Sequence, residues 1–295
     1  MSFQKILVLG AGAIGSSYGA LLSRKNDVTL IGRKNHIEVI NTKGLKICGD
    51  IQERFFVKAE TEIKEIPSDT LILLTTKAHD SAKALTEIKN LLKNDTVILI
   101  LQNGLGNKEL VQGIVGDKIE VLRGLVMMGA EFSKPGKITF WNGEIILEQT
   151  ESSKKIAELF NESMLKTRVS SKFESELWSK LVANCVINPL TAILRIRDNE
   201  IVVNTLKEVR HGIVDECVKV GKAEGIVFEE YLKKSLDEKI LQYTNFSSMC
   251  QDLMKEKKTE IDFLNGKIVE LGRKHHIPTP INETLVSLIK SLEAH

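Results

Sequence analysis

Short apolar runs alternate with segments of helical spacing through the first half of the chain. Four runs predict strands, and they lie at residues 6–9, 28–31, 71–75 and 96–101. The segments 14–22 and 81–92 carry apolar residues at helical spacing. Continuous apolar runs of four to six residues are typical of strands buried on both faces, and their alternation with helices favours a parallel sheet with crossover helices.

Three further segments, 55–59, 138–141 and 144–148, are strand candidates. The last two flank Asn142-Gly143, and an Asn-Gly pair between two strands indicates a β-hairpin turn.

The second half of the chain changes to a helical period. Long amphipathic patterns cover 200–222 and 259–274, and an apolar helix is predicted over 174–194. Of the 20 glycines, 15 lie in residues 1–150, so turns and close backbone approaches gather in the first half. A short polar stretch at 166–171 marks the boundary. We predict two domains, an α/β domain at 1–168 and an all-helical domain at 169–295.

A complete GxGxxG motif, formed by Gly10, Ala11, Gly12, Ala13, Ile14 and Gly15, follows the first strand and opens the first helix. The first glycine permits a tight turn, the second lets the backbone approach a pyrophosphate, and the third allows the helix to pack closely on the strand. The helix N-terminus adds N–H groups and a positive dipole end. We therefore predict a Rossmann-type parallel sheet that binds a dinucleotide.

The end of the second strand predicts which dinucleotide is bound. A site for NAD usually has an acidic residue there, whereas this chain has Gly32-Arg33-Lys34. A guanidinium can bind a 2′-phosphate bidentately, so Arg33 favours NADP. Lys77 and Asn103 follow the next two strands, and ligands of open parallel sheets collect at such strand ends. The sequence leaves open that each of these two is an ordinary loop residue.

Polar residues recur every four positions in the otherwise apolar segment 174–194. They are Glu176, Lys180, Asn184 and Asn188. A helix that is apolar on all other faces is buried, and buried polar groups need partners. Such a stripe fits either an active-site face or a hydrogen-bonded seam. Pro189 is expected to bend or end the helix at Asn188. A partly desolvated Lys180 suits proton transfer.

Composition excludes several classes of function. The chain has 41 Lys and Arg against 39 Asp and Glu, a net charge of +2, which gives no general reason to expect a nucleic acid or an anionic membrane as partner. The four cysteines form no CxxC pair, so we expect free thiols in a reducing compartment, no metal site and a cytoplasmic location. No apolar run is expected to cross a bilayer, and no signal peptide is expected before the first strand.

The motifs together resemble the ketopantoate reductase (2-dehydropantoate 2-reductase) family. They are GAGAIG at 10–15, TTKA at 75–78, QNG at 102–104, ELWSKLVANCVINPLTAI at 176–193, NFSSMCQDL at 245–253 and KKTEID at 257–262. The resemblance covers essentially the whole chain. It implies an N-terminal Rossmann domain, a helical C-terminal domain and an active site between them. It also implies reduction of 2-dehydropantoate to (R)-pantoate with NADPH, a step toward pantothenate and coenzyme A.

The resemblance also implies roles for single residues. Lys180 matches the proton donor to the keto oxygen, and Asn184, Asn188 and Ser248 match residues that hold the substrate. Asn245 lies in the same stretch as Ser248. Glu260 matches a glutamate that contacts both cofactor and substrate. Lys77, Asn103 and Ala130 match cofactor-side positions, with Asn103 also near the substrate.

One position departs from the family pattern. Where a further substrate asparagine is common, this chain reads Arg197-Asp198-Asn199. A carboxylate beside an anionic substrate is unfavourable unless Arg195 or Arg197 offsets it. Either Asp198 or Asn199 can be the equivalent residue. The departure leaves open an NADP-dependent reductase of another small 2-keto or 3-hydroxy acid. A separate alternative, which does not depend on Asp198, is a non-catalytic NADPH sensor.

Ser248 and Glu260 are 12 residues apart, about 18 Å along one straight helix. That is too far for both to contact one small acid. The charged run 255–258, followed by the helix-start signature Thr259-Glu260-Ile261-Asp262, predicts a break there. The apolar surface of 200–240 is either buried internally or forms a homodimer, which the sequence leaves open.

Overall fold

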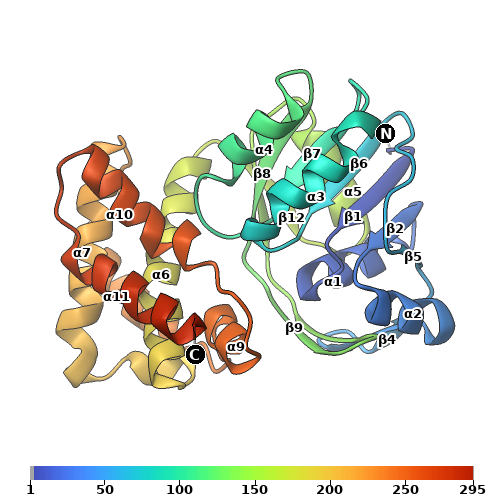
Figure 1. The fold of residues 1–295 in the computed structure, drawn as a ribbon. Coiled ribbons are helices and arrows are strands. Elements are labelled where there is room, and N and C mark those ends of the chain that lie inside the picture. Colours follow the sequence, from blue (N-terminus) through green and yellow to red (C-terminus); the bar gives the residue numbers. More distant parts are fainter. Residues whose placement is uncertain (1–2, 295) are drawn as a thin grey trace. The chain divides into compact units, whose positions relative to one another are not determined.

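The alternation of strands and helices predicted for the first half is confirmed in the structure. The computed structural model describes residues 3–294 and divides into two units, Met1–Gln102 with Asn107–Phe173 and Asn103–Gly106 with Glu174–His295. Figure 1 shows the first unit in blue to green and most of the second in yellow to red. The division between the long segments falls at Phe173/Glu174, and the short loop 103–106 groups with the second unit.

The main sheet of the first unit has the spatial order β12-β11-β8-β7-β6-β1-β2-β5. Its strands are β1 (Lys5–Leu9), β2 (Val28–Ile31), β5 (Lys58–Glu60), β6 (Thr70–Leu74), β7 (Val97–Ile100), β8 (Glu120–Val126), β11 (Ile145–Glu148) and β12 (Thr167–Ser170). The six strands from β5 to β8 are parallel to their neighbours, while β11 runs antiparallel to β8. Numbered along the chain, these six follow the Rossmann order 3-2-1-4-5-6.

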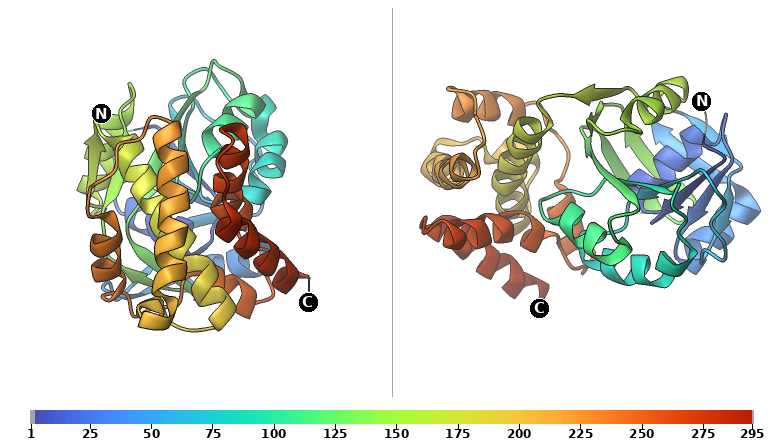
Figure 2. Two further views of the ribbon diagram at one scale, coloured as in Figure 1. Left: turned by 90° about the vertical axis from the view of Figure 1, so that its left-hand side faces the viewer. Right: turned by 90° about the horizontal axis from the view of Figure 1, so that it is seen from above.

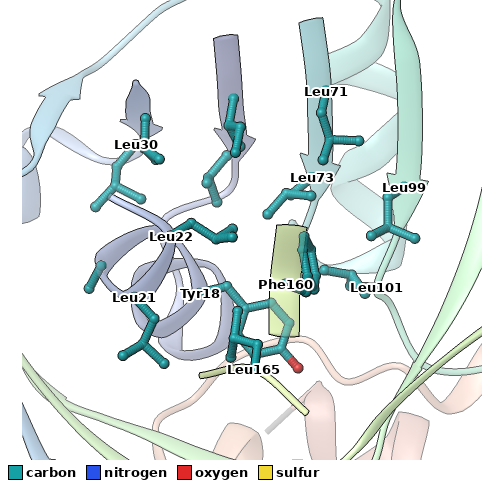
Figure 3. Close-up of a cluster of buried hydrophobic side chains, with 14 of the residues drawn as sticks. Tyr18, Leu21, Leu22, Leu30, Leu71, Leu73, Leu99, Leu101, Phe160 and Leu165 are labelled. Carbon is teal, nitrogen blue, oxygen red and sulfur yellow. The ribbon is translucent and has the colours of Figure 1, made fainter. Parts of the chain in front are cut away.

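Both faces of this sheet are buried, as the continuous apolar runs predict. On β1, Ile6 and Val8 belong to one core cluster, and Leu7 and Leu9 belong to another. The helices of this unit are α1 (Ala13–Leu22), α2 (Lys34–Lys43), α3 (Ser81–Ile88), α4 (Asn107–Val115) and α5 (Ser153–Glu162). Helices α1 and α5 pack on the first face, where Tyr18 meets Phe160 edge to face at 6.3 Å (Figure 3). Side chains of α3 and α4 cover the second face.

A smaller sheet packs against α1, and the strand predicted at 138–141 is one of its four strands, although the sequence patterns did not reveal the sheet itself. Its spatial order is β4-β3-β10-β9, and its strands are β3 (Leu45–Gly49), β4 (Glu53–Phe55), β9 (Gly129–Lys134) and β10 (Lys137–Trp141). The single strand expected at 55–59 is wrong, because β4 ends at Phe55 in this sheet and β5 begins at Lys58 in the main one.

The hairpin predicted at Asn142-Gly143 is also wrong. Strand β10 pairs with β9 and β3, whereas β11 pairs with β8 and β12, so the connection passes between two sheets. Neither Asn142 nor Gly143 has the positive φ that a type I′ turn requires. Gly143 instead permits a close approach, since a Cβ there would lie 2.2 Å from the Met127 oxygen.

The buried His36 connects three elements of the first unit. Its Nδ1 accepts a hydrogen bond from the Gly136 N–H at 3.0 Å, in the β9–β10 turn. The neutral ring therefore carries its hydrogen on Nε2, which lies 3.0 Å from the Ser16 hydroxyl on α1. Burial lowers the pKa of His36 to about 4.

We expect this histidine to make folding pH-dependent. An unfolded histidine has a pKa near 6.5, so between about pH 6.5 and 4 the unfolded chain binds more protons than the folded one. Stability should therefore fall as the pH drops through that window, by about 2 kcal/mol between pH 7.5 and pH 5. Urea unfolding at both pH values measures this, and in His36→Gln the pH dependence should shrink by about that amount. An unchanged slope would contradict the expectation.

The second unit is built of helices, as predicted. They are α6 (Phe173–Leu194), α7 (Lys207–Ala223), α8 (Leu232–Ile240), α9 (Ser248–Met254), α10 (Asn265–Lys274) and α11 (Pro280–Glu293). Short 3-10 turns lie between them at Asp198–Ile201, Asn204–Leu206 and Ile261–Phe263. Helix α7 lies beside α10 and α11 (Figure 2), and the core of this unit takes residues from all six helices.

Helix α6 differs from expectation in two respects. It continues through Pro189 to Leu194, so of the bend or end expected at Asn188 the end is wrong. It is also apolar and long enough to cross a membrane by length and composition, although polar residues interrupt its apolar sequence. Of its most apolar 18 residues, 67% are buried inside the protein. A buried core helix is therefore sufficient to explain its composition.

Candidate functional site

The glycine-rich turn has the backbone geometry that its motif requires. Gly10 has a φ of +114°, and a Cβ there would lie 2.5 Å from the Thr76 nitrogen. At Gly15 a Cβ would lie 2.2 Å from the Gly10 oxygen. Gly12 is different, because it is exposed and a Cβ there would meet nothing within 4 Å. The protein's own packing thus explains Gly10 and Gly15, while Gly12 leaves open space at the N-cap of α1.

This turn lies at the point where the strand order of the main sheet reverses. Strand β1 has β2 on one side and β6 on the other. The Thr75 hydroxyl, just after β6, donates to the Gly10 oxygen at 2.8 Å. The N–H groups of Gly10 and Ala11 donate to the Ile31 oxygen at the end of β2. Ligands of doubly wound sheets bind at such a switch point.

Arg33 begins the helix that follows β2. It is the exposed N-cap of α2, and no ion pair or side-chain hydrogen bond of its guanidinium is found within residues 3–294. The residue before it packs on the phosphate turn, since a Cβ on Gly32 would lie 2.8 Å from the Ala11 Cβ. A cation is therefore held at the edge of the glycine-rich turn.

Two further predicted residues lie on the same unit. Lys77 is partly buried and directly follows β6, at the N-cap of a 3-10 turn (Ala78–Asp80). The Gln102 amide ties this loop down by donating to the Thr76 oxygen at 2.7 Å and to the Ser81 hydroxyl at 2.6 Å. Ala130 is partly buried on β9, which packs against α1.

In the second unit Lys180, Asn103 and Glu260 come together from three segments. The Lys180 ammonium on α6 donates to the Asn103 Oδ1 at 2.9 Å. Asn103 is held by its neighbours, since the Leu105 N–H donates to the Phe263 oxygen and Gly104, with a φ of +91°, lies against that residue. Glu260 is the N-cap of the 3-10 turn that contains Phe263.

The environment of Lys180 suits a group that exchanges protons. Burial lowers the pKa of Lys180 to about 8, and the negative charge of Glu260 acts in the opposite direction. Glu260 itself is only 7% exposed, so its charge acts in a medium that screens it weakly. The result is an ammonium that can lose its proton near neutral pH while a hydrogen-bond acceptor fixes its position.

The rest of the polar stripe continues along α6. Since the helix is unbroken, Asn184 and Asn188 lie one and two turns beyond Lys180 on the same side. Asn184 is partly buried and Asn188 is 6% exposed. These amides thus extend the polar face that starts at Lys180.

Asp198 and Asn245 bind each other. Asn245 Nδ2 donates to Asp198 Oδ2 at 2.7 Å, and the Asp198 N–H donates to the Asn245 oxygen at 3.0 Å. Asp198 is 4% exposed, and this burial raises its pKa to about 7 despite the hydrogen bonds from Asn245 and the Ser247 backbone. Arg197 does not pair with this carboxylate, because it donates to the Thr244 oxygen and lies over the Phe246 ring. The Asn199 N–H donates to the Tyr243 oxygen.

The break predicted near 255–258 is confirmed. Helix α9 ends at Met254, and α10 begins only at Asn265. Two adjacent serines at the start of α9 have different surroundings. Ser247 is buried, and its hydroxyl accepts a hydrogen bond from the Cys250 N–H and lies 2.7 Å from the Thr191 hydroxyl, whereas Ser248 is exposed. The capping role falls to Ser247, which leaves the Ser248 hydroxyl available.

The sequence did not predict a series of hydrogen bonds between buried polar side chains in this unit. It joins Glu216, Asn282 and Asn265 to the backbone of α6. These residues come from three different helices, so no local spacing connects them. The one local signal was Pro189, which implies an unpaired carbonyl in α6.

The four cysteines are free, with Cys48 partly buried and the others buried. Within residues 3–294 no cluster of three or more histidine, cysteine or acidic side chains could hold a metal ion.

The chain was compared with known families, curated proteins and solved structures. Residues 6–151 match the family model described as ketopantoate reductase PanE/ApbA, and residues 172–293 match ketopantoate reductase PanE/ApbA C terminal. The 2-dehydropantoate 2-reductase of Pyrococcus horikoshii is 37% identical over 99% of this chain and 98% of its own. That of Aquifex aeolicus is 33% identical over 98% and 97%.

Solved structures give the same result. A PanE/ApbA family ketopantoate reductase from Ralstonia eutropha JMP134 has a TM-score of 0.93 at 29% identity, covering 98% of each chain. A D-mandelate dehydrogenase solved with NADH and anilino(oxo)acetate has a TM-score of 0.90 at 28% identity, also covering 98% of each chain. Since the two family models match most of the sequence and full-length relatives exceed 30% identity, this chain belongs to the ketopantoate reductase family.

Proposed function

We propose that the chain reduces 2-dehydropantoate to (R)-pantoate with NADPH, using Lys180 as the proton donor. The family reduces ketopantoate to pantoate with NADPH, a step of pantothenate and coenzyme A biosynthesis. The observation that carries the assignment of the donor is the contact of Lys180 with Asn103 beside Glu260. Lys180 combines a position on the polar face of α6 with a pKa near neutrality.

The first unit fits an NADP dinucleotide. Gly12 leaves room for a pyrophosphate at the N-terminus of α1, where helix N–H groups and the helix dipole favour an anion. Arg33, whose side chain has no ion pair with residues 3–294, can bind a 2′-phosphate. Ala11, Ala13, Ile14, Lys77, Ala130 and Asn103 are the further cofactor residues that we propose, with Glu260 shared between cofactor and substrate. The bound nicotinamide supplies the hydride for the keto carbon.

Lys180 donates the proton of the reaction in this proposal. As the keto carbon is reduced, its oxygen gains negative charge, and a neighbouring ammonium both stabilises that charge and transfers a proton to it. Asn103 orients the ammonium through its Oδ1. The charge of Glu260 favours the protonated form of Lys180, so that the lysine carries its proton before each turnover.

The remaining polar groups bind the substrate in this proposal. Asn184 and Asn188 offer amides along α6, and the exposed Ser248 hydroxyl, next to Asn245, binds the carboxylate. Asp198 takes part indirectly, because it fixes the Asn245 side chain. An assay of NADPH oxidation with ketopantoate tests the whole assignment, and the absence of turnover would refute it.

A second candidate substrate is another small 2-keto acid. It is favoured by the buried carboxyl of Asp198 next to Asn245 and by the likeness to a D-mandelate dehydrogenase. Rates on a panel of 2-keto acids, with ketopantoate and phenylglyoxylate among them, separate the two. A kcat/KM at least tenfold higher for ketopantoate is the outcome that our assignment requires.

The charge of Asp198 gives a prediction for substrate binding. Its pKa of about 7 means that the carboxyl is largely neutral at pH 6 and ionised at pH 8. An anionic substrate should therefore bind less well at pH 8. We expect Asp198→Asn to lower the KM for ketopantoate about threefold at pH 8 and to change it little at pH 6, consistent with a charge interaction screened by water. Equal effects at both pH values would show that Asp198 acts by packing alone.

We further propose a cytoplasmic homodimer. Free cysteines suit a reducing compartment, and Val227 and Tyr231 remain 79% and 71% exposed in the second unit. Light scattering after size-exclusion chromatography tests the dimer, and a mass near 33 kDa would rule it out.

A further inference from the structure

Helix α6 contains a proline one turn after the cysteine at its centre. Pro189 has no N–H, so it cannot donate to the carbonyl of the residue four positions earlier, which is Cys185. Cys185 is fully buried, and a buried carbonyl without a partner is unfavourable. The Asn265 side chain meets this need, because its Nδ2 donates to the Cys185 oxygen at 3.0 Å.

The orientation of the Asn265 amide is fixed by its neighbours. The Glu216 carboxylate accepts from Asn282 Nδ2 at 2.6 Å, which directs Asn282 Oδ1 toward Asn265. Asn265 Nδ2 donates to that oxygen at 2.9 Å. The two ends of this series of hydrogen bonds, the Glu216 carboxylate and the Cys185 carbonyl, can only accept hydrogen bonds. If the Asn265 amide were flipped, its oxygen would therefore face two other oxygens. Asn265 and Asn282 are fully buried, and Glu216 is 7% exposed.

Glu216, at the far end of this series of hydrogen bonds, is itself held in position. Its carboxylate accepts the Ile281 and Asn282 N–H groups at 2.9 and 3.0 Å, at the start of α11. The position of Asn265 is therefore determined by α7 and α11, as well as by its own place at the start of α10. A rigid donor is presented to α6 at the one turn where the helix lacks its own.

We propose that Asn265 is a positioning residue for the substrate amides: it replaces the N–H that Pro189 lacks and so keeps Asn184 and Asn188 on the face of Lys180. The two asparagines bracket the affected carbonyl, with Asn184 directly before Cys185 and Asn188 directly before the proline. On the far side of the proline, the Thr191 hydroxyl donates to the Ile187 oxygen at 2.8 Å, which holds the next turn. The role in substrate binding rests on the proposed function, whereas the pairing with Pro189 does not.

A double-mutant cycle tests the proposal. Asn265→Ala removes the donor, and Pro189→Ala restores a backbone N–H for the same carbonyl. Asn265→Ala alone should raise the KM for ketopantoate about tenfold, the effect expected for one unsatisfied buried acceptor, with NADPH affinity unchanged. In the P189A background the same substitution should change that KM less than twofold. Asn282→Ala is the matched control, because it removes the hydrogen bonds that link Glu216 to Asn265 while leaving Asn265 bound to Cys185. The effect of Asn282→Ala on the KM should therefore not be rescued by P189A.

The outcomes separate the inference from the function it builds on. A tenfold KM effect of N265A that persists in the P189A background overturns the proposal, as does an insoluble N265A/P189A protein. An insoluble N265A whose P189A double variant is soluble and has a KM close to that of P189A supports it. If the wild type does not turn over ketopantoate, the proposed function fails. The midpoints of urea unfolding of the wild type, N265A, P189A and N265A/P189A then decide whether Asn265 substitutes for the missing N–H.

Discussion

Replacing Lys180 with alanine is expected to lower kcat for ketopantoate by a factor of about 10² to 10⁴, the usual contribution of a positioned acid or base. The physical reason is that nothing then neutralises the charge that develops on the keto oxygen. NADPH binding should remain within about twofold of wild type, since the phosphate turn and Arg33 belong to the other unit. Stopped-flow or steady-state NADPH oxidation measures the turnover, and fluorescence titration measures the binding.

The pH profile makes this prediction specific. A proton donor must be protonated, and the pKa of Lys180 lies at about 8, so kcat/KM should fall above pH 8 by about tenfold per pH unit. Lys180→Arg keeps the positive charge but holds its proton too tightly, so it should recover substrate affinity without recovering kcat. The exposed Lys219 of the same unit is the control, and Lys219→Ala should behave as wild type. Turnover of Lys180→Ala within a factor of about three of wild type would remove Lys180 from the mechanism.

The parts of the fold that depend on local pattern were predictable. Strands β1, β2, β6 and β7 are mostly apolar because both of their faces are buried, and that signal is visible in the sequence alone. Of the small sheet only the strand at 138–141 was predicted, because exposed strands such as Glu53–Phe55 carry no such run. The Asn142-Gly143 pair misled for a related reason, since its conformation is set by which sheets its neighbours join.

The candidate site likewise has parts that local spacing predicts and parts that it does not predict. The glycine turn and the stripe on α6 follow from local spacing, which fixes a turn or one face of a helix. That Asn103 meets Lys180, and that Ser247 caps a helix while Ser248 stays exposed, depend on contacts between segments far apart in the chain. Pro189 shows the limit most clearly. The helix does not end there, and Asn265, 76 residues later, donates to the carbonyl that Pro189 leaves without its helical partner.

Replacing Arg33 with glutamate is expected to raise the KM for NADPH about 100-fold. The substitution removes charge-assisted hydrogen bonds to the 2′-phosphate, worth roughly 1.5–3 kcal/mol, and adds a repulsive carboxylate. The KM for NADH should change by less than about threefold, because that cofactor carries a hydroxyl at the same place and an acidic residue suits it. A protein of similar fold was solved with NADH, so the comparison of the two cofactors tests the role of Arg33 directly.

Two neighbouring substitutions separate the causes. Arg33→Gln removes the charge without adding repulsion, so it should raise the KM for NADPH only about tenfold. Lys34→Gln changes the adjacent exposed cation, which is 3.8 Å from Glu38, and should have a much smaller effect. Full kinetics with both cofactors on the three variants give the ratio of kcat/KM for NADPH over NADH. That ratio should fall in the order wild type, R33Q, R33E, and a KM for NADPH that R33E leaves unchanged would mean that another residue reads the 2′-phosphate.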